Sequence, residues 1–502
     1  MRFLTSTLTA VSVAFAAVAG ASSGDDPFSH DCKHTSSSIQ TELGPRLSPN
    51  ATIDFRCDNS TLFKELTHRY STVDPGLAAF VSVGAGEDVG EIIKYALETD
   101  RQVLAGNRRH GWSKSLNRVK DAIMIDISTL LDIDIDTAGN TVTVGGGVNI
   151  GEIMAALQAV GKETPTGGCD CVGLLGATLG GGHGRLQGLH GLMIDNLLSA
   201  QLTIATGEII TVSNTSNPEL FWGLRGAGQN FGIITEATYR IYDATNGGVQ
   251  FMANIIYDTT LLPEVFEALN NYEVPAETTI LVAFFVDPVT IEPQLFVNFV
   301  SSIPEAAARA QFKSVFGHIP YLSMTDKVLP WASANGASIS QPACESRARK
   351  ELSGVSTKGW HLPSIQLVYE KFVEFVSDPA WAGAVVVFES YPVKGVQAVP
   401  AETTAYPWRD ETGLVLLSIS YKNATLDGAA DDWVNEVMAI LHADSGFDRP
   451  AVYMNYAKGT EGFGAVYGYE KWRQAKLKDL KRKWDPSCMF SGYNPIPIHC
   501  EA

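Results

Sequence analysis

The stretch 165–184, PTGGCDCVGLLGATLGGGHG, places Cys169 and Cys171 one residue apart and follows them with clustered glycines and His183. Such a stretch suits a disulfide, a metal site, an anion cradle or a bound cofactor. A disulfide between these two cysteines is sterically strained at that separation. A zinc site would need a further Cys-x-x-Cys or a histidine pair at ligand spacing, and the stretch has neither.

Glycine clusters elsewhere in the sequence favour the cofactor. They recur at 145–147, 167–168 and 180–182, and single glycines follow at 226, 228 and 232. Each cluster alone suits a tight turn, but glycines also let backbone amides approach a ligand and form anion-binding nests. Because several clusters fall in one segment, the pattern favours a phosphate-bearing cofactor.

Residues 81–93, VSVGAGEDVGEII, nearly match the dinucleotide fingerprint, in which a strand runs into a glycine turn and a helix. That fingerprint needs an acidic residue at the end of the next strand to bind the ribose. Ala105 and Gly106 stand there, and the glycine spacing is one residue off. A nicotinamide site is therefore not expected. The sequence also lacks the Gly-x-Ser-x-Gly motif of serine hydrolases.

The order of elements indicates an α+β fold. Short β-rich runs alternate with amphipathic helical runs from about 79 to 242. Longer spacings and strands such as GAVVVFES at 383–390 indicate a second domain. Near the C-terminus the pattern predicts a strand in AVYMNYA, 451–457, and a helix over 469–484 whose basic run 471–483 is a solvated face.

The chain is too long for a single hydrophobic core. Arg2 and the apolar run LTAVSVAFAAVAG before small residues are typical of a cleaved signal peptide, so we expect a secreted protein without a membrane anchor. The predicted parts are a signal peptide at 1–21, an N-terminal segment at 22–74, a cofactor domain at 75–243, a substrate domain at 244–445 and a C-terminal segment at 446–502 that completes the cofactor domain.

Other features agree with secretion. Asn50, Asn59, Asn214 and Asn423 begin N-glycosylation sequons. The sequence has 7 cysteines, which should mostly pair in an oxidising compartment; Cys32 and Cys57 suit one disulfide, and the odd count leaves a sulfur for another purpose. The net charge of −18 argues against nucleic acid or an anionic membrane as a partner.

Five motifs occur in an order that carries a family resemblance: VLAGNRRHGWS (103–113), TGGCDCVGLLGATLGGGHGRLQGLHG (166–191), DNLLSAQLTIATGEI (195–209), LFWGLRGAGQNFGIIT (220–235) and YMNYA (453–457). The chain resembles the berberine-bridge-enzyme-like branch of the FAD-linked oxidases, in the vanillyl-alcohol-oxidase superfamily. The resemblance covers nearly the whole chain after the signal peptide. It implies a PCMH-type FAD-binding domain of two α/β subdomains, plus a substrate domain with an antiparallel sheet covered by helices.

The resemblance implies bicovalent FAD. His110 matches the histidine that bonds to the flavin 8α-methyl, and Cys169 matches the cysteine that bonds to ring carbon C6; Cys171 is the less favoured alternative. Two such bonds withdraw electron density and make the flavin a stronger hydride acceptor. Arg108 and Arg109 depart from the Gly-Gly pair of the family. They either bind phosphate by charge or leave the histidyl bond strained or absent.

The resemblance also implies that other matched positions surround FAD. Val172 matches a position beside the flavin where oxidases carry a small residue that admits dioxygen. The remaining expected cofactor-binding residues are Gly106, Asn107, Arg108, Arg109, Gly111, Gly173, Gly176, Gly180, Gly181, Gly182, His183, Gly184, Asn196, Gly232, Ile233 and Asn494. No metal site is expected.

Tyr456 matches the tyrosine that carbohydrate-oxidising members use as the base, with Tyr453 and Asn455 to orient it. A tyrosine base needs a pKa depressed below its usual value of about 10. Ser420 stands where alkaloid-oxidising members carry a glutamate, which leaves the tyrosine as the expected proton acceptor. These tyrosines would alternatively form only the pocket wall.

The resulting function is a secreted FAD-dependent oxidase that acts on an alcohol-, sugar- or secondary-metabolite-type small molecule, with O2 as acceptor and H2O2 as product. Two alternatives stay open. One is a flavin-containing isomerase or cyclase without net redox chemistry, and the other is a secreted flavoprotein without turnover. The substrate domain carries no motif that names a substrate.

Overall fold

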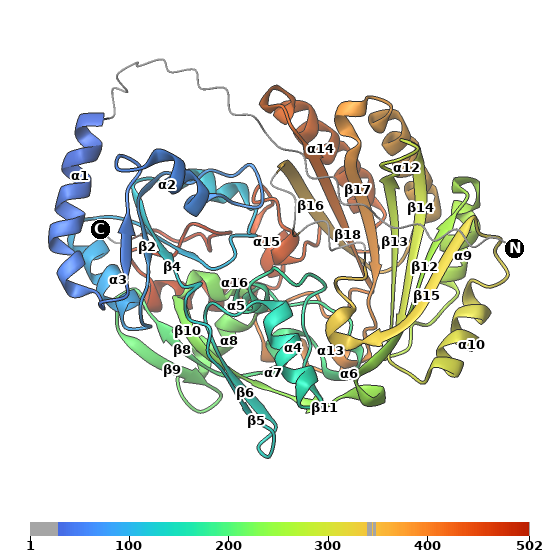
Figure 1. Cartoon of the computed structure of the whole chain (residues 1–502), viewed down its shortest axis with the longest axis horizontal. Helices are drawn as coiled ribbons and strands as arrows, with labels where there is room; N and C mark the ends of the chain where they lie inside the picture. The colour runs from blue at the N-terminus through green and yellow to red at the C-terminus, as the bar shows by residue number, and fades with distance from the viewer. Residues whose placement is uncertain (1–28, 339–343, 345–347, 501–502) are drawn as a thin grey trace, which may run out of the picture.

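The computed structural model describes residues 29–338, 344 and 348–500, with side chains from residue 35 onward (Figure 1). The predicted signal peptide at 1–21 lies outside the described residues, as does the start of the N-terminal segment.

The first sheet has four strands in the order β1-β2-β4-β3. Strands β2, β4 and β3 run parallel, whereas β1 pairs antiparallel with β2. Apolar residues of α3 at Val89, Ile92, Ile93 and Ala96 have helical spacing and pack on this sheet together with α1. The bounds are β1 Thr52–Asp54, β2 Leu77–Ser82, β3 Val103–Gly106, β4 Ala122–Asp126, α1 Ser29–Glu42, α2 Ser60–Thr67 and α3 Asp88–Glu98.

The loop between β2 and α3 contains the near-match to the dinucleotide fingerprint. The Asp88 carboxylate accepts hydrogen bonds from the backbone amides of Gly84 (2.8 Å) and Ala85 (3.1 Å). These amides already bind a protein carboxylate, which agrees with the absence of a nicotinamide fingerprint.

The second sheet is antiparallel, in the order β5-β6-β10-β8-β9, and helices α4, α5, α8 and α16 share its core. Its elements are β5 Ile133–Asp136, β6 Thr141–Gly145, α4 Ile150–Ala159, α5 Leu174–Leu179, α6 Gln187–His190, α7 Met193–Asn196, β8 Leu197–Thr203, β9 Ile209–Ser213, α8 Pro218–Ala227 and β10 Ile233–Arg240; β7 Lys162–Glu163 pairs with β11 Tyr242–Asp243.

The third sheet has seven antiparallel strands in the order β15-β12-β14-β13-β17-β18-β16. Helices α9, α10, α12 and α14 cover one face, and the other face is turned toward the first two sheets (Figure 1). The bounds are β12 Val249–Tyr257, α9 Leu262–Asn270, β13 Thr278–Val286, β14 Pro293–Ser301, α10 Glu305–Val315, β15 Ser323–Pro330, β16 Arg349–Thr357, α12 Leu362–Val376, β17 Gly383–Ser390, α13 Lys394–Gln397, β18 Gly413–Tyr421 and α14 Asp427–Ala443.

The predicted strand at 451–457 is wrong. This segment forms no strand; it contains a short 3-10 turn at Met454–Tyr456. Its alternation has another cause: Val452 and Met454 pack into the core of the second sheet, whereas Ala451 and Tyr453 pack against the open face of the third. The segment lies between two hydrophobic cores, and successive side chains point alternately into one core and the other. The apolar residues therefore alternate although the segment does not pair with a neighbouring strand.

The C-terminal elements are α15 Phe463–Tyr467 and α16 Lys471–Trp484. The expectation that the basic run of α16 is a solvated face is wrong at two positions, because Arg473 and Lys481 are both 0% exposed. Arg473 donates to the carbonyl oxygens of Thr404 and Ala405, so its charge is used to hold a loop.

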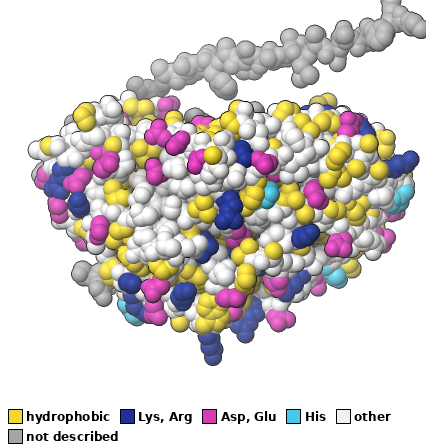
Figure 2. Space-filling view, turned by 90° about the horizontal axis from the view of Figure 1, so that it is seen from below, with side chains coloured by type: hydrophobic (Ala, Val, Ile, Leu, Met, Phe, Trp, Pro, Cys, Tyr) yellow, Lys and Arg dark blue, Asp and Glu magenta, His cyan; other side chains and the backbone are white. Residues whose placement is uncertain are grey.

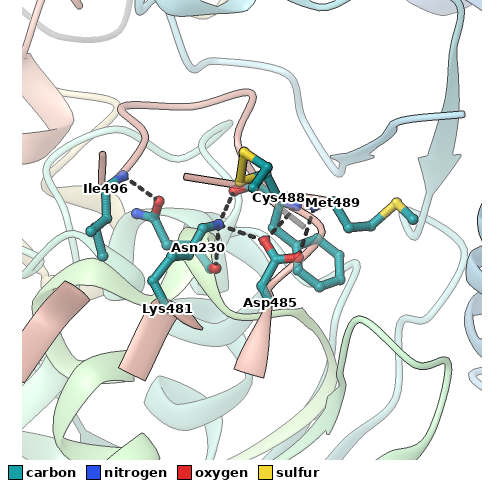
Figure 3. The surroundings of a disulfide bond; sticks show 8 residues. Asn230, Lys481, Asp485, Cys488, Met489 and Ile496 are labelled. Atoms are coloured by element: carbon teal, nitrogen blue, oxygen red, sulfur yellow. Dashed lines mark hydrogen bonds and ion pairs between the residues drawn. A yellow bond between two sulfur atoms is a disulfide. The ribbon is translucent and has the colours of Figure 1, made fainter. Parts of the chain in front are cut away.

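Lys481 ties the C-terminal tail to the second sheet (Figure 3). Its ammonium group pairs with Asp485 and donates to the carbonyl oxygens of Asn230 (2.9 Å) and Phe490 (3.2 Å). The Asp485 carboxylate also accepts from the backbone amides of Met489 and Phe490. Beside this pair, Cys488 and Cys500 form a disulfide. Cys57 is also disulfide-bonded, but the side chain of Cys32, its predicted partner, lies outside those described.

The surface carries mixed charge. On the face shown in Figure 2, acidic and basic side chains are interspersed. Asn50, Asn59, Asn214 and Asn423 are exposed. Every helix in the part of the chain that the structure describes is too short or too polar to cross a lipid bilayer.

Replacing Lys481 should destabilise the protein strongly. Lys481→Ala leaves the fully buried Asp485 carboxylate without its cation, which costs about 3–5 kcal/mol of unfolding free energy. Lys483→Ala, on the exposed side of the same helix, is the control and should change the unfolding free energy by less than about 0.5 kcal/mol. Urea unfolding measures both, and equal effects would show that the buried pair does not anchor the tail.

Candidate active site

A cavity of about 740 Å³ lies between the first two sheets, the open face of the third sheet and the C-terminal segment. This volume is within the range of about 300–1,000 Å³ typical of ligand and cofactor sites. Loops at 106–112, 167–176 and 229–234 form one wall, and strands β13, β16, β17 and β18 form the opposite wall.

The wall formed by segments 106–112, 167–176 and 229–234 has room for a large cofactor and offers buried polar atoms to bind it. A Cβ atom on Gly176 would have no neighbour within 4 Å, and one on Gly168 would meet only the Tyr391 hydroxyl at 3.8 Å, so both glycines leave open space in the cavity. Asn107 Oδ1 and Trp112 Nε1 are buried polar atoms without a hydrogen-bond partner among the described residues. The residues present therefore fit FAD, which has both a flat ring and polar groups.

Arg108 and Arg109 line the cavity, but both guanidinium groups are paired with carboxylates. Arg108 pairs with Glu152 and Arg109 with Asp126, each at 3.1 Å. The loop therefore presents its backbone to the cofactor, rather than two unpaired cations. Arg109 has φ +57°, a left-handed conformation that glycine adopts more easily, so the loop keeps a glycine-like shape where the family has glycine.

His110 is poised as a neutral imidazole. Burial, with smaller contributions from the nearby cations Lys350, Arg69 and Arg109, lowers its pKa to about 4. The ring lies 4.9 Å from the Tyr70 ring, centroid to centroid. A neutral imidazole keeps a lone pair available for bond formation, which agrees with the predicted attachment role.

Cys169 lies in the cavity wall, with Cys171 and Cys344 beside it. Cys171 forms a disulfide with Cys344, whereas Cys169 retains its thiol. Burial, with a smaller contribution from the Asp170 charge, raises the pKa of the Cys169 thiol to about 11. Because Cys171 and Cys344 are paired with each other, Cys169 is the cysteine of this group that keeps a thiol; its attachment to flavin stays a prediction.

Tyr456 and Glu389 form a hydrogen-bonded pair in the cavity. The Tyr456 hydroxyl donates to Glu389 Oε2 at 3.0 Å, and the two residues come from the C-terminal segment and β17. A Cβ on Gly354 of β16 would lie 2.7 Å from the Cβ of Tyr456, so only glycine lets the tyrosine approach the sheet this closely. Trp112 stacks on the Tyr456 ring, with centroids 5.9 Å apart.

The pKa values correct the expected mechanism. Burial, reinforced by the Glu389 charge, raises the pKa of Tyr456 well above its usual value instead of depressing it. Burial also raises the pKa of Glu389 to about 7. The expectation that Ser420 removes a glutamate from the site is wrong, because Ser420 does line the cavity but the neighbouring strand supplies Glu389. The phenol therefore keeps its proton, and Glu389 is the group of the pair that gains and loses a proton near neutral pH.

Tyr453 and Asn455 hold the glycine turn in place. The Tyr453 oxygen accepts from the Gly182 amide (3.0 Å) and from Asn455 Nδ2 (2.7 Å). Asn455 Nδ2 also donates to the Ala177 carbonyl. Because Tyr453 precedes the 3-10 turn Met454–Tyr456 and Tyr456 is its last residue, fixing the first ring helps to position the second.

The structure brings most of the predicted residues together. Lining the cavity are Gly106, Asn107, Arg108, Arg109, His110, Gly111, Cys169, Val172, Gly173, Gly176, Gly182, His183, Gly232, Ile233, Tyr453, Asn455 and Tyr456. His183 is nonetheless committed to the protein: its Nδ1 contacts Gln187 (3.0 Å) and its Nε2 contacts Tyr406 (2.7 Å).

The other predicted residues have structural roles outside the lining. Gly180 and Gly184 permit close packing, since added Cβ atoms would lie 2.1 Å from Asn455 Oδ1 and 1.7 Å from the Thr166 oxygen; Gly181 has φ +134°. Asn196 donates to the carbonyl oxygens of His190 and Leu192. Asn494 accepts from Ser113 Oγ at 2.6 Å. Each of these residues supports the fold, and its contact with the cofactor stays a prediction.

Sequence reasoning missed Glu389, Lys350 and Trp112. Glu389 and Lys350 project from strands into the cavity, and burial lowers the pKa of Lys350 to about 8. The sequence did contain one signal for Glu389: it is the single acidic residue in GAVVVFES, a run of apolar residues that is typical of a buried strand. The sheet wall also carries the hydroxyl groups of Ser418 and Ser420. Its remaining lining side chains are apolar: Leu281, Phe285, Leu352, Val385, Val387 and Leu416.

Comparisons with known proteins agree with this geometry. Residues 77–213 match the FAD binding domain family. A FAD-linked oxidoreductase from Pyricularia oryzae is 34% identical over 459 residues, which cover 89% of this chain and 89% of the relative. Another FAD-linked oxidoreductase, from Aspergillus terreus, is 34% identical over 468 residues, which cover 91% of this chain and 94% of the relative.

Solved structures share the fold. Xylooligosaccharide oxidase from Myceliophthora thermophila has a TM-score of 0.78 at 19% identity, covering 92% of this chain and 99% of that chain. Wild-type BBE-like 1 from Physcomitrella patens has a TM-score of 0.79 at 20% identity, covering 92% and 100%. The fold and cavity thus define a flavin-dependent enzyme with the PCMH-type architecture that the motifs predicted. The chain belongs to the family of FAD-linked oxidoreductases.

A side chain at Gly176 should displace the cofactor without unfolding the protein. Gly176→Val projects into the open cavity and should reduce bound flavin strongly. Gly428→Val is the control, since Gly428 also has no neighbour within 4 Å of its added Cβ but lies on α14, away from the cavity. The ratio of flavin to protein absorbance measures the effect. Equal flavin content in the two variants would contradict this location of the cofactor.

Proposed function

We propose that this chain is an FAD-dependent oxidase that removes a hydride from a carbon bearing a hydroxyl group and passes the electrons to O2, giving H2O2. The observation that carries the proposal is the Tyr456–Glu389 hydrogen bond, which faces the glycine-lined wall across one cavity. A proton acceptor opposite a flavin-sized cradle is the arrangement that alcohol oxidation needs.

The loops at 106–112, 167–176 and 229–234 would hold FAD, with His110 and Cys169 as the attachment residues. Bound FAD supplies the acceptor for the hydride. Val172 lines the cavity and is small enough to leave room for O2.

Tyr456 and Glu389 act together on the proton of the substrate hydroxyl. Tyr456 takes that proton on its phenolic oxygen while its own proton moves to Glu389 Oε2, across the 3.0 Å hydrogen bond. Tyrosine therefore stays neutral throughout, as its raised pKa requires. The carboxylate is the final acceptor, and its pKa of about 7 suits a base that works near neutral pH.

Although Lys350, Ser418 and Ser420 are polar, most side chains of the sheet wall are apolar and favour a substrate with an apolar body. Leu352, Val385, Val387 and Leu416 offer little hydrogen bonding to a polyhydroxylated sugar. The structural neighbours include a xylooligosaccharide oxidase and a chitooligosaccharide oxidase, but at 19–20% identity these share the fold alone. We infer an aryl or allylic alcohol of secondary-metabolite type.

Flavin reduction should depend on Glu389 ionisation. In anaerobic mixing with an active alcohol from an aryl, allylic and oligosaccharide panel, the reduction rate should fall as pH drops below about 7, because protonated Glu389 accepts no proton. Glu389→Gln should lose this pH dependence and slow reduction by about 10²–10⁴-fold. Tyr456→Phe should slow reduction to a similar extent and keep its flavin. Ser420→Ala is the control and should retain the wild-type pH profile.

Two outcomes would contradict the proposed function. A Glu389→Gln variant that reduces flavin at the wild-type rate would remove the carboxylate from the mechanism. Product formation without O2 uptake would replace the oxidase with an isomerase or cyclase.

The flavin should be covalently held. Acid precipitation of the wild-type protein should leave the colour in the pellet, and His110→Ala and Cys169→Ala should each keep one bond. The double variant alone should release FAD into the supernatant. Release from the wild type would refute covalent attachment.

We also propose that the protein is secreted and glycosylated, which the exposed sequon residues support. Glycosidase treatment of protein secreted from a fungal host should lower its apparent mass, and simultaneous Asn→Gln changes at Asn50, Asn59, Asn214 and Asn423 should abolish that shift. An unchanged mass after treatment would contradict the glycosylation.

A further inference from the structure

Three cysteine sulfurs meet at the edge of the cavity. Cys169 Sγ lies 3.2 Å from Cys344 Sγ and 3.6 Å from Cys171 Sγ, and Cys171 and Cys344 are joined as a disulfide. All three side chains are partly buried. Sulfurs this close can form three different disulfides, and each pairing leaves a different cysteine as the thiol.

The pairings differ in what they present to the cavity. Cys169 lines the cavity, whereas Cys171 and Cys344 are not among its described lining residues. Cys171 Sγ instead lies 3.4 Å from His110 Nε2. A thiol at Cys171 would therefore interfere with both proposed attachment residues. It would be a competing nucleophile beside His110, and it could form a disulfide with Cys169.

We propose that Cys344 is a protecting residue: by holding Cys171 in a disulfide, it makes Cys169 the sulfur that reacts in the cavity. The inference rests on the proposed covalent FAD. In that reaction the Cys169 sulfur replaces hydrogen on a flavin ring carbon. The two electrons and two protons released pass to O2, which becomes H2O2, so the attachment is balanced without a further oxidant.

Hydrogen bonds from Asn335 also hold the chain that precedes Cys344 close to the turn that carries Cys169. Asn335 Nδ2 donates to Asp170 Oδ1 (2.9 Å) and to the Gly167 carbonyl (3.2 Å), and Arg185 donates to Asn335 Oδ1. These bonds join the segment that precedes Cys344 to the turn that carries Cys169. A purely stapling role is therefore the alternative that the experiment must separate from protection.

Three proteins separate the two roles: wild type, Cys344→Ser, and the double variant Cys171→Ser/Cys344→Ser. Each is secreted under the same conditions, alkylated with iodoacetamide without reduction, digested and mapped by mass spectrometry. The wild type should show the Cys171–Cys344 disulfide, and Cys169 should be the one cysteine of the three that carries flavin or the alkyl group. In Cys344→Ser, flavin at Cys169 should fall by about half or more, with a Cys169–Cys171 disulfide or flavin on Cys171, because two thiols now compete.

The double variant decides the matter. It lacks the disulfide but also lacks the competing thiol, so protection predicts flavin at Cys169 restored to the wild-type level. A double variant as defective as Cys344→Ser would overturn the inference in favour of a staple, and a Cys344→Ser map identical to wild type would also overturn it. If the wild type carries no flavin on cysteine, the proposed attachment fails. In that case the alkylation map still tests the role of Cys344. Alkylation of Cys169 alone in the wild type, together with alkylation of both Cys169 and Cys171 or a Cys169–Cys171 disulfide in Cys344→Ser, supports protection by Cys344. Any other alkylation pattern overturns it.

Discussion

The cavity depends on backbone segments approaching one another more closely than a side chain permits. A Cβ atom on Gly184 would lie 1.7 Å from the Thr166 oxygen, and one on Gly354 would lie 2.7 Å from the Cβ of Tyr456. The first contact folds the turn that presents Cys169, and the second lets Tyr456 sit against the sheet. Without both approaches the cofactor wall and the proton acceptor would not share one cavity.

Burial then sets the chemistry of that cavity. Desolvation raises the pKa of Glu389 to about 7 and lowers that of His110 to about 4. One group becomes a base suited to neutral pH, and the other becomes a neutral nucleophile. In the proposed function, the same enclosure would therefore serve two different reactions, substrate oxidation and cofactor attachment, through groups on opposite walls.

Sequence reasoning found the parts of the site that local motifs encode. The glycine turn, His110, Cys169 and Tyr456 each stand in a short motif, and the cavity collects all of them. Glu389 was missed because its position depends on which face of β17 is turned from the helices, and that is set by pairing with β13 and β18. The strand expected at 451–457 failed for a related reason: its alternation reflects two flanking cores, which only the tertiary structure reveals.

The proposed reaction depends on Glu389 as a buried carboxyl group that gains and loses its proton near neutral pH. Infrared difference spectroscopy of the flavin-loaded protein, titrated from about pH 5 to about pH 9, measures this directly through the carboxyl C=O band. We expect a band that disappears around pH 7 in the wild type and is absent in Glu389→Gln. A wild-type spectrum in which no carboxyl group titrates above about pH 6 would contradict the account.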